Sequence, residues 1–168
     1  MSTAKIPSVF SLRFYTLPVV IPKKLKPGFG GMYAAAKEGL NKPIEVAAQV
    51  PEYMDYQKWR LVNPDKTEDC QILFVPSDPQ VELGGSGFTS PSESPERIVT
   101  LSEKPSSYLF RDLAVTEDGQ PIVSIHPTDW NCPSETEAYV TVSSDNQVII
   151  QCFPKNPTEM ALPGWIVY

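Results

Sequence analysis

Proline is the residue that most constrains how this chain can fold. The sequence has 18 prolines among 168 residues, roughly 11%, against about 5% in an average protein. Each proline removes a backbone hydrogen-bond donor and fixes φ, and the prolines are spread along the whole chain. Long helices and long central strands are therefore disfavoured, and the sequence predicts short strands joined by stiff loops.

The length and the charge of the chain limit the classes of protein to which it can belong. A chain of 168 residues has the size of one domain, and we expect a single domain over 1–168. Hydrophobic residues make up 41% and charged residues 20%, which predicts a folded protein that is neither disordered nor in a membrane. The net charge is -6 and the lysine run at 23–26 is short, so we expect no nucleic-acid partner.

The cysteines bear on metals and on the cellular compartment. Cys70, Cys132 and Cys152 are an odd number and lack the spacing of a metal site. Cys70 and Cys152 lie in apolar runs, so we expect them to be free thiols packed in the core. Arg13 and several prolines interrupt the first 22 residues, and we expect no signal peptide. These features predict a reduced, cytoplasmic monomer without metal or other cofactor.

Apolar segments of strand length recur along the whole chain, separated by clusters of turn-forming residues. We expect twelve short strands, at 11–19, 31–37, 43–49, 57–62, 71–76, 87–90, 97–102, 108–115, 121–126, 137–143, 147–153 and 164–168.

Large aromatic residues indicate an internal repeat among these segments. Trp59, Phe110 and Trp165 each end an apolar stretch and recur about every 50–55 residues, close to a third of the chain. The pattern predicts an all-β protein, a β-trefoil with twelve short strands in three four-strand repeats. The single domain would then divide into repeats at about 11–63, 70–116 and 120–168. A β-sandwich of seven to nine strands is the alternative.

The sequence offers little for catalysis. His126 is the one histidine, and no sequence signature places a nucleophile beside it. The carboxylate pairs at 68–69 and 117–118 lie in turn-like sequence, where solvated surface charge is the simpler interpretation. We therefore expect no enzymatic activity.

A glycine cluster, 27–31, is the more informative feature. Its sequence is Pro-Gly-Phe-Gly-Gly, and no strand–helix unit follows it, so it does not predict a phosphate-binding loop. Glycines also let a backbone approach a partner closely, which suits a wedge inserted into a protease cleft. An ordinary tight turn between two strands is the alternative.

Several stretches resemble one known family. Residues 30–39 (GGMYAAAKEG), 42–46 (KPIEV) and Trp59 are similar to the first repeat of the mycocypins, the macrocypins and clitocypins of mushrooms. Residues 14–16 and 162–166 also match that family. The resemblance implies a β-trefoil that inhibits papain-like cysteine proteases of the cathepsin L type, a fungal defence protein. It implies that two loops, between strands one and two and between strands three and four, straddle the active-site cleft of the protease.

Carried onto this sequence, the resemblance assigns the protease contacts to two sets of residues. The first set is Pro27, Gly28, Phe29, Gly30, Gly31 and Met32, and the second is Pro51, Glu52, Tyr53, Met54 and Asp55. Among them Phe29, Tyr53 and Met54 are the expected apolar anchors.

A further loop and one tryptophan leave other functions open. In the family, the loop between strands five and six can inhibit legumain or trypsin, and here it corresponds to 77–86, with Asp78, Gln80 and Leu83 as candidate contacts. This loop lacks the basic residue that a trypsin pocket requires, and Asp78 is a weak substitute for the Asn that legumain requires. Carbohydrate binding, with Trp130 as a candidate contact, and serine protease inhibition through another loop are the alternatives.

Overall fold

The computed structural model describes residues 5–63, 69–78, 85–90, 97–155 and 161–168. Within them the protein is all-β, as predicted, with thirteen strands and one helix of four residues. No helix in this part of the chain is long and apolar enough to cross a membrane. The strands are β1 (Leu12–Thr16), β2 (Lys24–Leu25), β3 (Met32–Ala35), β4 (Glu45–Ala48), β5 (Trp59–Val62), β6 (Gln71–Phe74), β7 (Gly87–Thr89), β8 (Thr100–Ser102), β9 (Tyr108–Thr116), β10 (Pro121–Pro127), β11 (Thr136–Val142), β12 (Val148–Pro154) and β13 (Pro163–Val167), and the helix is α1 (Pro51–Met54).

Each of the twelve predicted segments overlaps one observed strand. The thirteenth strand, β2, has two residues and was not predicted. It pairs in parallel with β9 through Lys24 and Val115, in the middle of the long connection between β1 and β3. The helix α1 was not predicted either, and it lies in the connection between β4 and β5.

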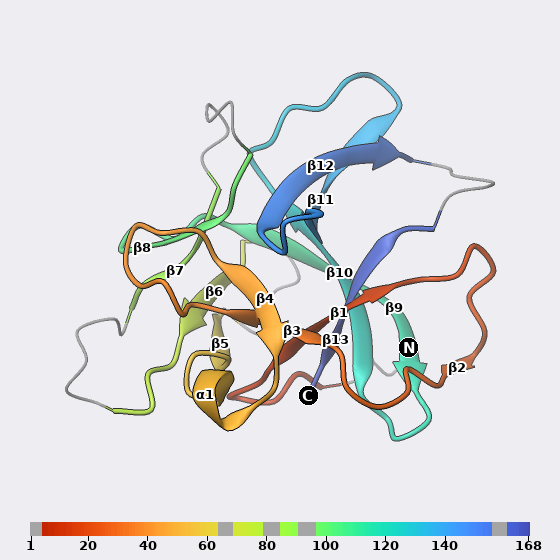
Figure 1. The fold of residues 1–168 in the computed structure, drawn as a ribbon. Helices are drawn as coiled ribbons and strands as arrows, with labels where there is room; N and C mark the ends of the chain where they lie inside the picture. Colours follow the sequence, from red (N-terminus) through yellow and green to blue (C-terminus); the bar gives the residue numbers. More distant parts are fainter. Residues whose placement is uncertain (1–4, 64–68, 79–84, 91–96, 156–160) are drawn as a thin grey trace.

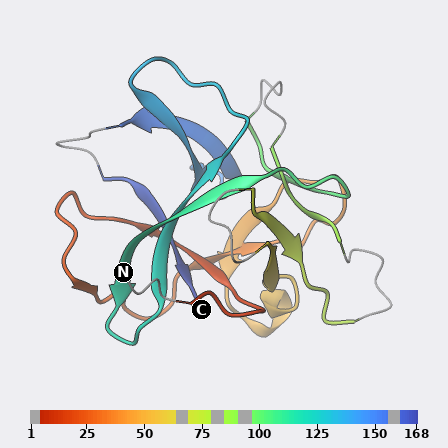
Figure 2. The same ribbon diagram turned by 180° about the vertical axis from the view of Figure 1, so that it is seen from behind.

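Six of the strands pair around a closed ring (Figures 1 and 2). β1 pairs with β13, β13 with β10, and β10 with β9, all antiparallel. β5 and β6 form a hairpin, and a bridge at each side of it, Phe10 to Trp59 and Cys70 to Tyr108, joins it to the starts of β1 and β9. Each of the six strands therefore has a neighbour on both sides, which protects the sheet from pairing with another chain.

Three more strand pairs lie beside this ring. β3 pairs with β4, β7 with β8, and β11 with β12. Single bridges join the three pairs to one another: Pro43 to Thr100, Glu45 to Gln147, and Ile98 to Ile149. Each pair is thus bridged to both of the others.

The two predicted closing tryptophans occupy matching places in the core. The Trp59 indole N–H donates to the Ala34 carbonyl and the Trp165 indole N–H to the Val140 carbonyl, each at 3.0 Å and each across 25 residues of sequence. Both side chains are completely buried. Burial of such large side chains contributes much of the apolar stabilisation of a small domain.

In the middle third of the chain, the aromatic residue that corresponds to Trp59 and Trp165 is Tyr108 rather than the predicted Phe110. Trp59 and Tyr108 both close the ring, through the bridges to Phe10 and Cys70. Tyr108 is fully buried, with its hydroxyl 2.8 Å from Ser90 Oγ, and burial raises the pKa of its phenol far above the ordinary value. Phe110 is two residues further along β9 and pairs with Ile125. The sequence pattern could not separate two aromatics so close together.

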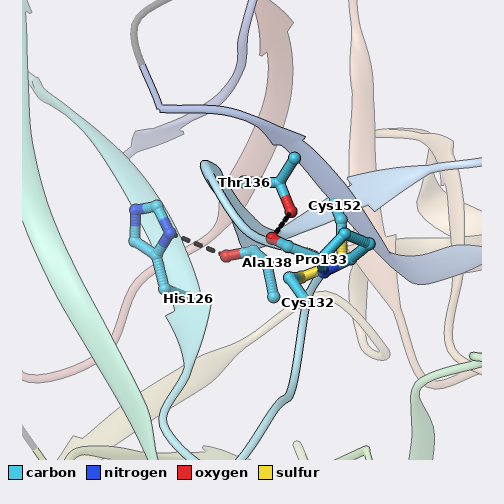
Figure 3. Close-up of a disulfide and its surroundings, with 6 residues drawn as sticks. All are labelled: His126, Cys132, Pro133, Thr136, Ala138 and Cys152. Carbon is cyan, nitrogen blue, oxygen red and sulfur yellow. Dashed lines mark hydrogen bonds between the residues drawn. A yellow bond between two sulfur atoms is a disulfide. The ribbon is translucent and has the colours of Figure 1, made fainter.

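The cysteines differ from the sequence prediction. Cys132 and Cys152 form a disulfide that joins the β10–β11 connection to β12 (Figure 3). The expected free thiol at Cys152 is therefore wrong, whereas Cys70 is buried in the core as predicted and is not part of this disulfide. Burial raises the pKa of the Cys70 thiol, which makes it a poor nucleophile.

Removing this disulfide should destabilise the fold. The two cysteines are 20 residues apart, so a double Cys132→Ser and Cys152→Ser variant should lose about 3 kcal/mol of unfolding free energy. Urea denaturation of the variant, and of the native protein with and without a reducing agent, measures the loss. A loss below about 1 kcal/mol in both comparisons would contradict a stabilising role for this bond.

Candidate functional site

Strand pairing brings the two predicted loops to one end of the molecule. Met32, which follows the glycine cluster, is the register partner of Ala48, after which the second loop begins. The first loop therefore enters the β3–β4 hairpin at the end where the second loop leaves it. Figure 1 shows this end in its lower half, where the approach to β3 and the turn of α1 both lie.

Arg13 holds the first loop in place. Its Nη1 and Nη2 atoms, reaching out from β1, donate to the carbonyls of Gly28 (3.0 Å) and Pro27 (2.9 Å). Gly28, Gly30 and Gly31 all have positive φ values, of 75°, 81° and 104°. A Cβ atom on Gly31 would overlap the Arg13 side chain, so this glycine is required by both conformation and space. The glycine cluster is thus a shaped loop and not a simple tight turn.

The tip of this loop presents Phe29 to solvent. Its exposure is 107%, so the side chain has no cover from the rest of the protein. Val19, Val20 and Ile21, earlier in the same β1–β3 connection, are also exposed, and Val20 reaches 83%. Met32, in contrast, is partly buried and packs against the core. An apolar side chain held out on a rigid loop is typical of a binding anchor.

The second loop is a helical turn. Pro51 occupies the first turn of α1, where its missing N–H costs nothing, and no residue of the helix is buried. Met54 is 43% and Tyr56 39% exposed, so the turn offers two further apolar side chains. Tyr53 is half-buried under the Lys37 ammonium, which lies 5.0 Å from the ring centroid. Tyr56 was not among the predicted contacts.

A buried glutamine fixes the path of the second loop. The Gln57 side chain is 1% exposed, and its Nε2 donates to the carbonyls of Ala47 (3.0 Å) and Ala48 (3.2 Å). The Ala36 N–H also donates to the Tyr56 carbonyl. These bonds tie the end of the turn back to the β3–β4 hairpin, so both loops are held by side-chain or backbone bonds from neighbouring strands.

The third predicted loop begins next to the second. Ser77 Oγ donates to Asp55 Oδ1 at 3.0 Å, which places the start of 77–86 against the end of the α1 turn. Asp78 is exposed. Gln80 and Leu83 lie outside the described residues.

His126 has the hydrogen bonds of a structural residue. Its side chain is 4% exposed, Nδ1–H donates to the Ala138 carbonyl (2.8 Å), and Nε2 accepts from the buried Ser124 hydroxyl (2.7 Å). Figure 3 shows the bond to Ala138. Because the ring and the hydroxyl are both inaccessible, this pair is not placed to attack a substrate. Among the described residues there is also no group of three acidic, Cys or His side chains able to hold a metal.

The burial of His126 makes stability depend on pH. Burial lowers its pKa below the ordinary 6.5, so the unfolded chain binds this proton more readily than the native protein. Below about pH 6.5 the free energy of unfolding should fall with decreasing pH, by at most about 1.4 kcal/mol per unit. Urea denaturation between about pH 5 and pH 7 measures the slope, and His126→Gln should remove it because the chain has no other histidine.

Glu137 sets the lowest pH at which the slope of the unfolding free energy can be assigned to His126 alone. Burial acts to raise the pKa of this carboxyl, but the Arg111 guanidinium at 2.9 Å outweighs it, so the pKa is lowered. This group adds its own loss of stability only as the pH falls below its ordinary value of 4.5. A His126→Gln variant that keeps the full slope above that pH would contradict the assignment to histidine.

The architecture defines a class of protein, a closed β scaffold that holds two loops with exposed apolar side chains at one end. A family model described as peptidase inhibitor clitocypin matches residues 13–167. The chain therefore belongs to the clitocypin family of peptidase inhibitors, and the resemblance seen in the sequence is confirmed. No curated protein matches the chain.

Proposed function

We propose that this peptidase inhibitor acts on papain-like cysteine proteases of the cathepsin L type. The resemblance to the mycocypins supplies the target class. The observation that carries the mechanism is the Met32–Ala48 pair, because it brings the glycine cluster and the α1 turn to the same end of one hairpin. Two loops held side by side form a double wedge that fits a cleft open at both ends.

Inhibition would be steric. The first loop presents Phe29 on a backbone that glycines keep narrow, and the second presents Met54 and Tyr56. Both loops would cover the protease nucleophile without offering it a peptide bond in a cleavable geometry. Because Arg13 and Gln57 already hold the loops in shape, little conformational entropy is lost on binding.

The test is inhibition of papain and a cathepsin L-type protease, with trypsin and legumain beside them. The native protein should inhibit the first two, and Phe29→Ala should weaken that inhibition roughly 30-fold or more, the effect of losing a central apolar anchor. Trp130→Ala is the matched control, an aromatic substitution in the β10–β11 connection, remote from both loops along the chain. Failure to inhibit either cysteine protease would overturn the target class. A Phe29→Ala variant that inhibits them as strongly as the native protein does would overturn the role of the first loop.

We propose that the architecture is a β-trefoil with repeats at about 11–63, 70–116 and 120–168. The closed ring of six strands and the three bridged strand pairs support this arrangement. So do the matching indole bonds of Trp59 and Trp165. A crystal structure in which the three repeats fail to superpose would contradict it.

Inhibition of legumain through 77–86 is a second candidate, favoured only by the contact of Ser77 with Asp55, and inhibition of a serine protease would use another loop. The monomeric state and the cytoplasmic location stay predictions. Light scattering after gel filtration tests the first. Alkylation of thiols in the source cells tests the second, because the Cys132–Cys152 disulfide is a feature more common in oxidising compartments.

A further inference from the structure

A pocket of about 580 Å³ lies away from the two loops. It is bounded by β9, the end of β10, the β10–β11 connection and the start of β11, and none of its residues belongs to the glycine cluster or to the α1 turn. Its volume falls within the roughly 300–1,000 Å³ of known small-molecule sites. Its lining is mostly polar and includes Arg111, Thr128, Trp130, Asn131, Thr136 and Glu137.

One wall of the pocket is held firmly. The β10–β11 connection runs from Thr128, whose N–H is bonded to the segment before β9, to Glu135, whose carbonyl accepts from the Lys155 N–H. Between these points Cys132 is joined to Cys152 on β12 (Figure 3). A connection that only had to link two strands would not need three such restraints. They hold the stretch that carries Trp130 and Asn131 in one place, as a preformed binding site requires.

The charges around the pocket cancel. Arg111 and Lys155 contribute two positive groups, and Asp69 and Glu137 contribute two negative ones. His126, which also lines the pocket, donates one ring N–H to a backbone carbonyl and accepts from Ser124 at the other nitrogen, which is the neutral form. Such a balance favours a neutral polar ligand over an anion or a cation.

Two side chains of the wall are available to a ligand. Trp130 is partly exposed, with the rest of its ring packed against the core, and Asn131 is exposed. Neither side chain is hydrogen-bonded to another residue in the described part of the chain. Arg111 and Glu137 also line the pocket, where Arg111 Nη1 donates to Glu137 Oε1 at 2.9 Å and both side chains keep further donor and acceptor positions.

We propose that this pocket binds a carbohydrate. The apolar face of a neutral sugar ring stacks on Trp130, whose π face attracts the weakly positive ring C–H groups. Its hydroxyls bond to the Asn131 amide and to the Arg111–Glu137 pair, which both offer donors and acceptors. This site does not depend on the proposed inhibition, and both activities could operate in one molecule.

The experiment begins with labelled protein on an array of immobilised mono- and oligosaccharides. The methyl glycoside of the terminal sugar of the strongest ligand is then titrated against the free protein. Trp59 and Trp165 are completely buried, so a change in tryptophan fluorescence on binding reports Trp130. Trp130→Ala and Asn131→Ala should each weaken binding about tenfold or more, and Phe29→Ala, on the first loop, should leave it unchanged.

Each result decides the proposal. An array without any signal above background overturns it, and so does full binding by Trp130→Ala. Should Trp130→Ala lose its native circular dichroism spectrum, Asn131→Ala decides, because that exposed side chain supports no other residue. Protease inhibition is measured on the same samples: loss of sugar binding with inhibition intact separates this site from the inhibitory loops.

Discussion

Gly31→Ala should weaken protease inhibition by about 1–3 kcal/mol, roughly fivefold to 150-fold in Ki. The new Cβ would occupy the space of the Arg13 side chain. Either Arg13 moves and loses its bonds to the Pro27 and Gly28 carbonyls, or the loop moves away from β1. In both cases Phe29 is no longer held at the tip. Titration of the variant against papain measures the effect.

A matched control separates this effect from backbone strain. Gly39 has a φ of 91° and lies in the turn at the other end of the β3–β4 hairpin, where an added Cβ meets nothing. Gly39→Ala should therefore have the same conformational cost and unchanged inhibition. Arg13→Ala removes the obstacle but not the strain of an alanine at a positive φ, so adding Gly31→Ala to it should cost less than Gly31→Ala does alone. Additive losses in that pair of variants would show that Arg13 and Gly31 act separately.

Trp165→Phe should lower the free energy of unfolding by about 3 kcal/mol. The smaller ring leaves a cavity in the core, and the Val140 carbonyl loses the indole N–H that it accepts. Urea denaturation should show a lower midpoint with an unchanged slope, since the unfolded surface stays the same.

The same substitution at Trp130 is its control. That ring is partly exposed and makes no hydrogen bond with another described residue, so Trp130→Phe should cost less than about 1 kcal/mol. Equal losses at the two positions would mean that burial and the bond to Val140 do not set the cost.

The strands and the core tryptophans could be predicted because they depend on local pattern. Apolar segments of strand length between clusters of turn-forming residues located all twelve predicted strands. Trp59 and Trp165 stood out because each ends an apolar stretch and because, with Phe110, they recur at about a third of the chain length. Tyr108 and Phe110 were confused because both lie on the same face of β9, two residues apart.

Only part of the candidate site could be predicted from the sequence. The glycine cluster and the position of the second loop could be found from composition and from family resemblance. The side chains that hold the loops could not be predicted in this way. Arg13 bonds to Gly28, 15 residues further along the chain, and the bond from Gln57 to Ala47 depends on tertiary packing. A charged residue in the otherwise apolar β1 was the available signal for Arg13. The partner of Cys152 was hidden for a similar reason, because three cysteines do not reveal which two will meet.

The pairing of β1 with β13 makes the support of the first loop depend on residues that are far apart in the sequence. Arg13 lies opposite Ile166 in this ladder and also donates to the Tyr168 hydroxyl, so its final position requires that β1 and β13 have already paired. Such distant pairing makes folding slow compared with local helix formation. The bonds from Arg13 to the first loop should therefore form late in folding, and a chain in which β1 and β13 are still apart lacks this support.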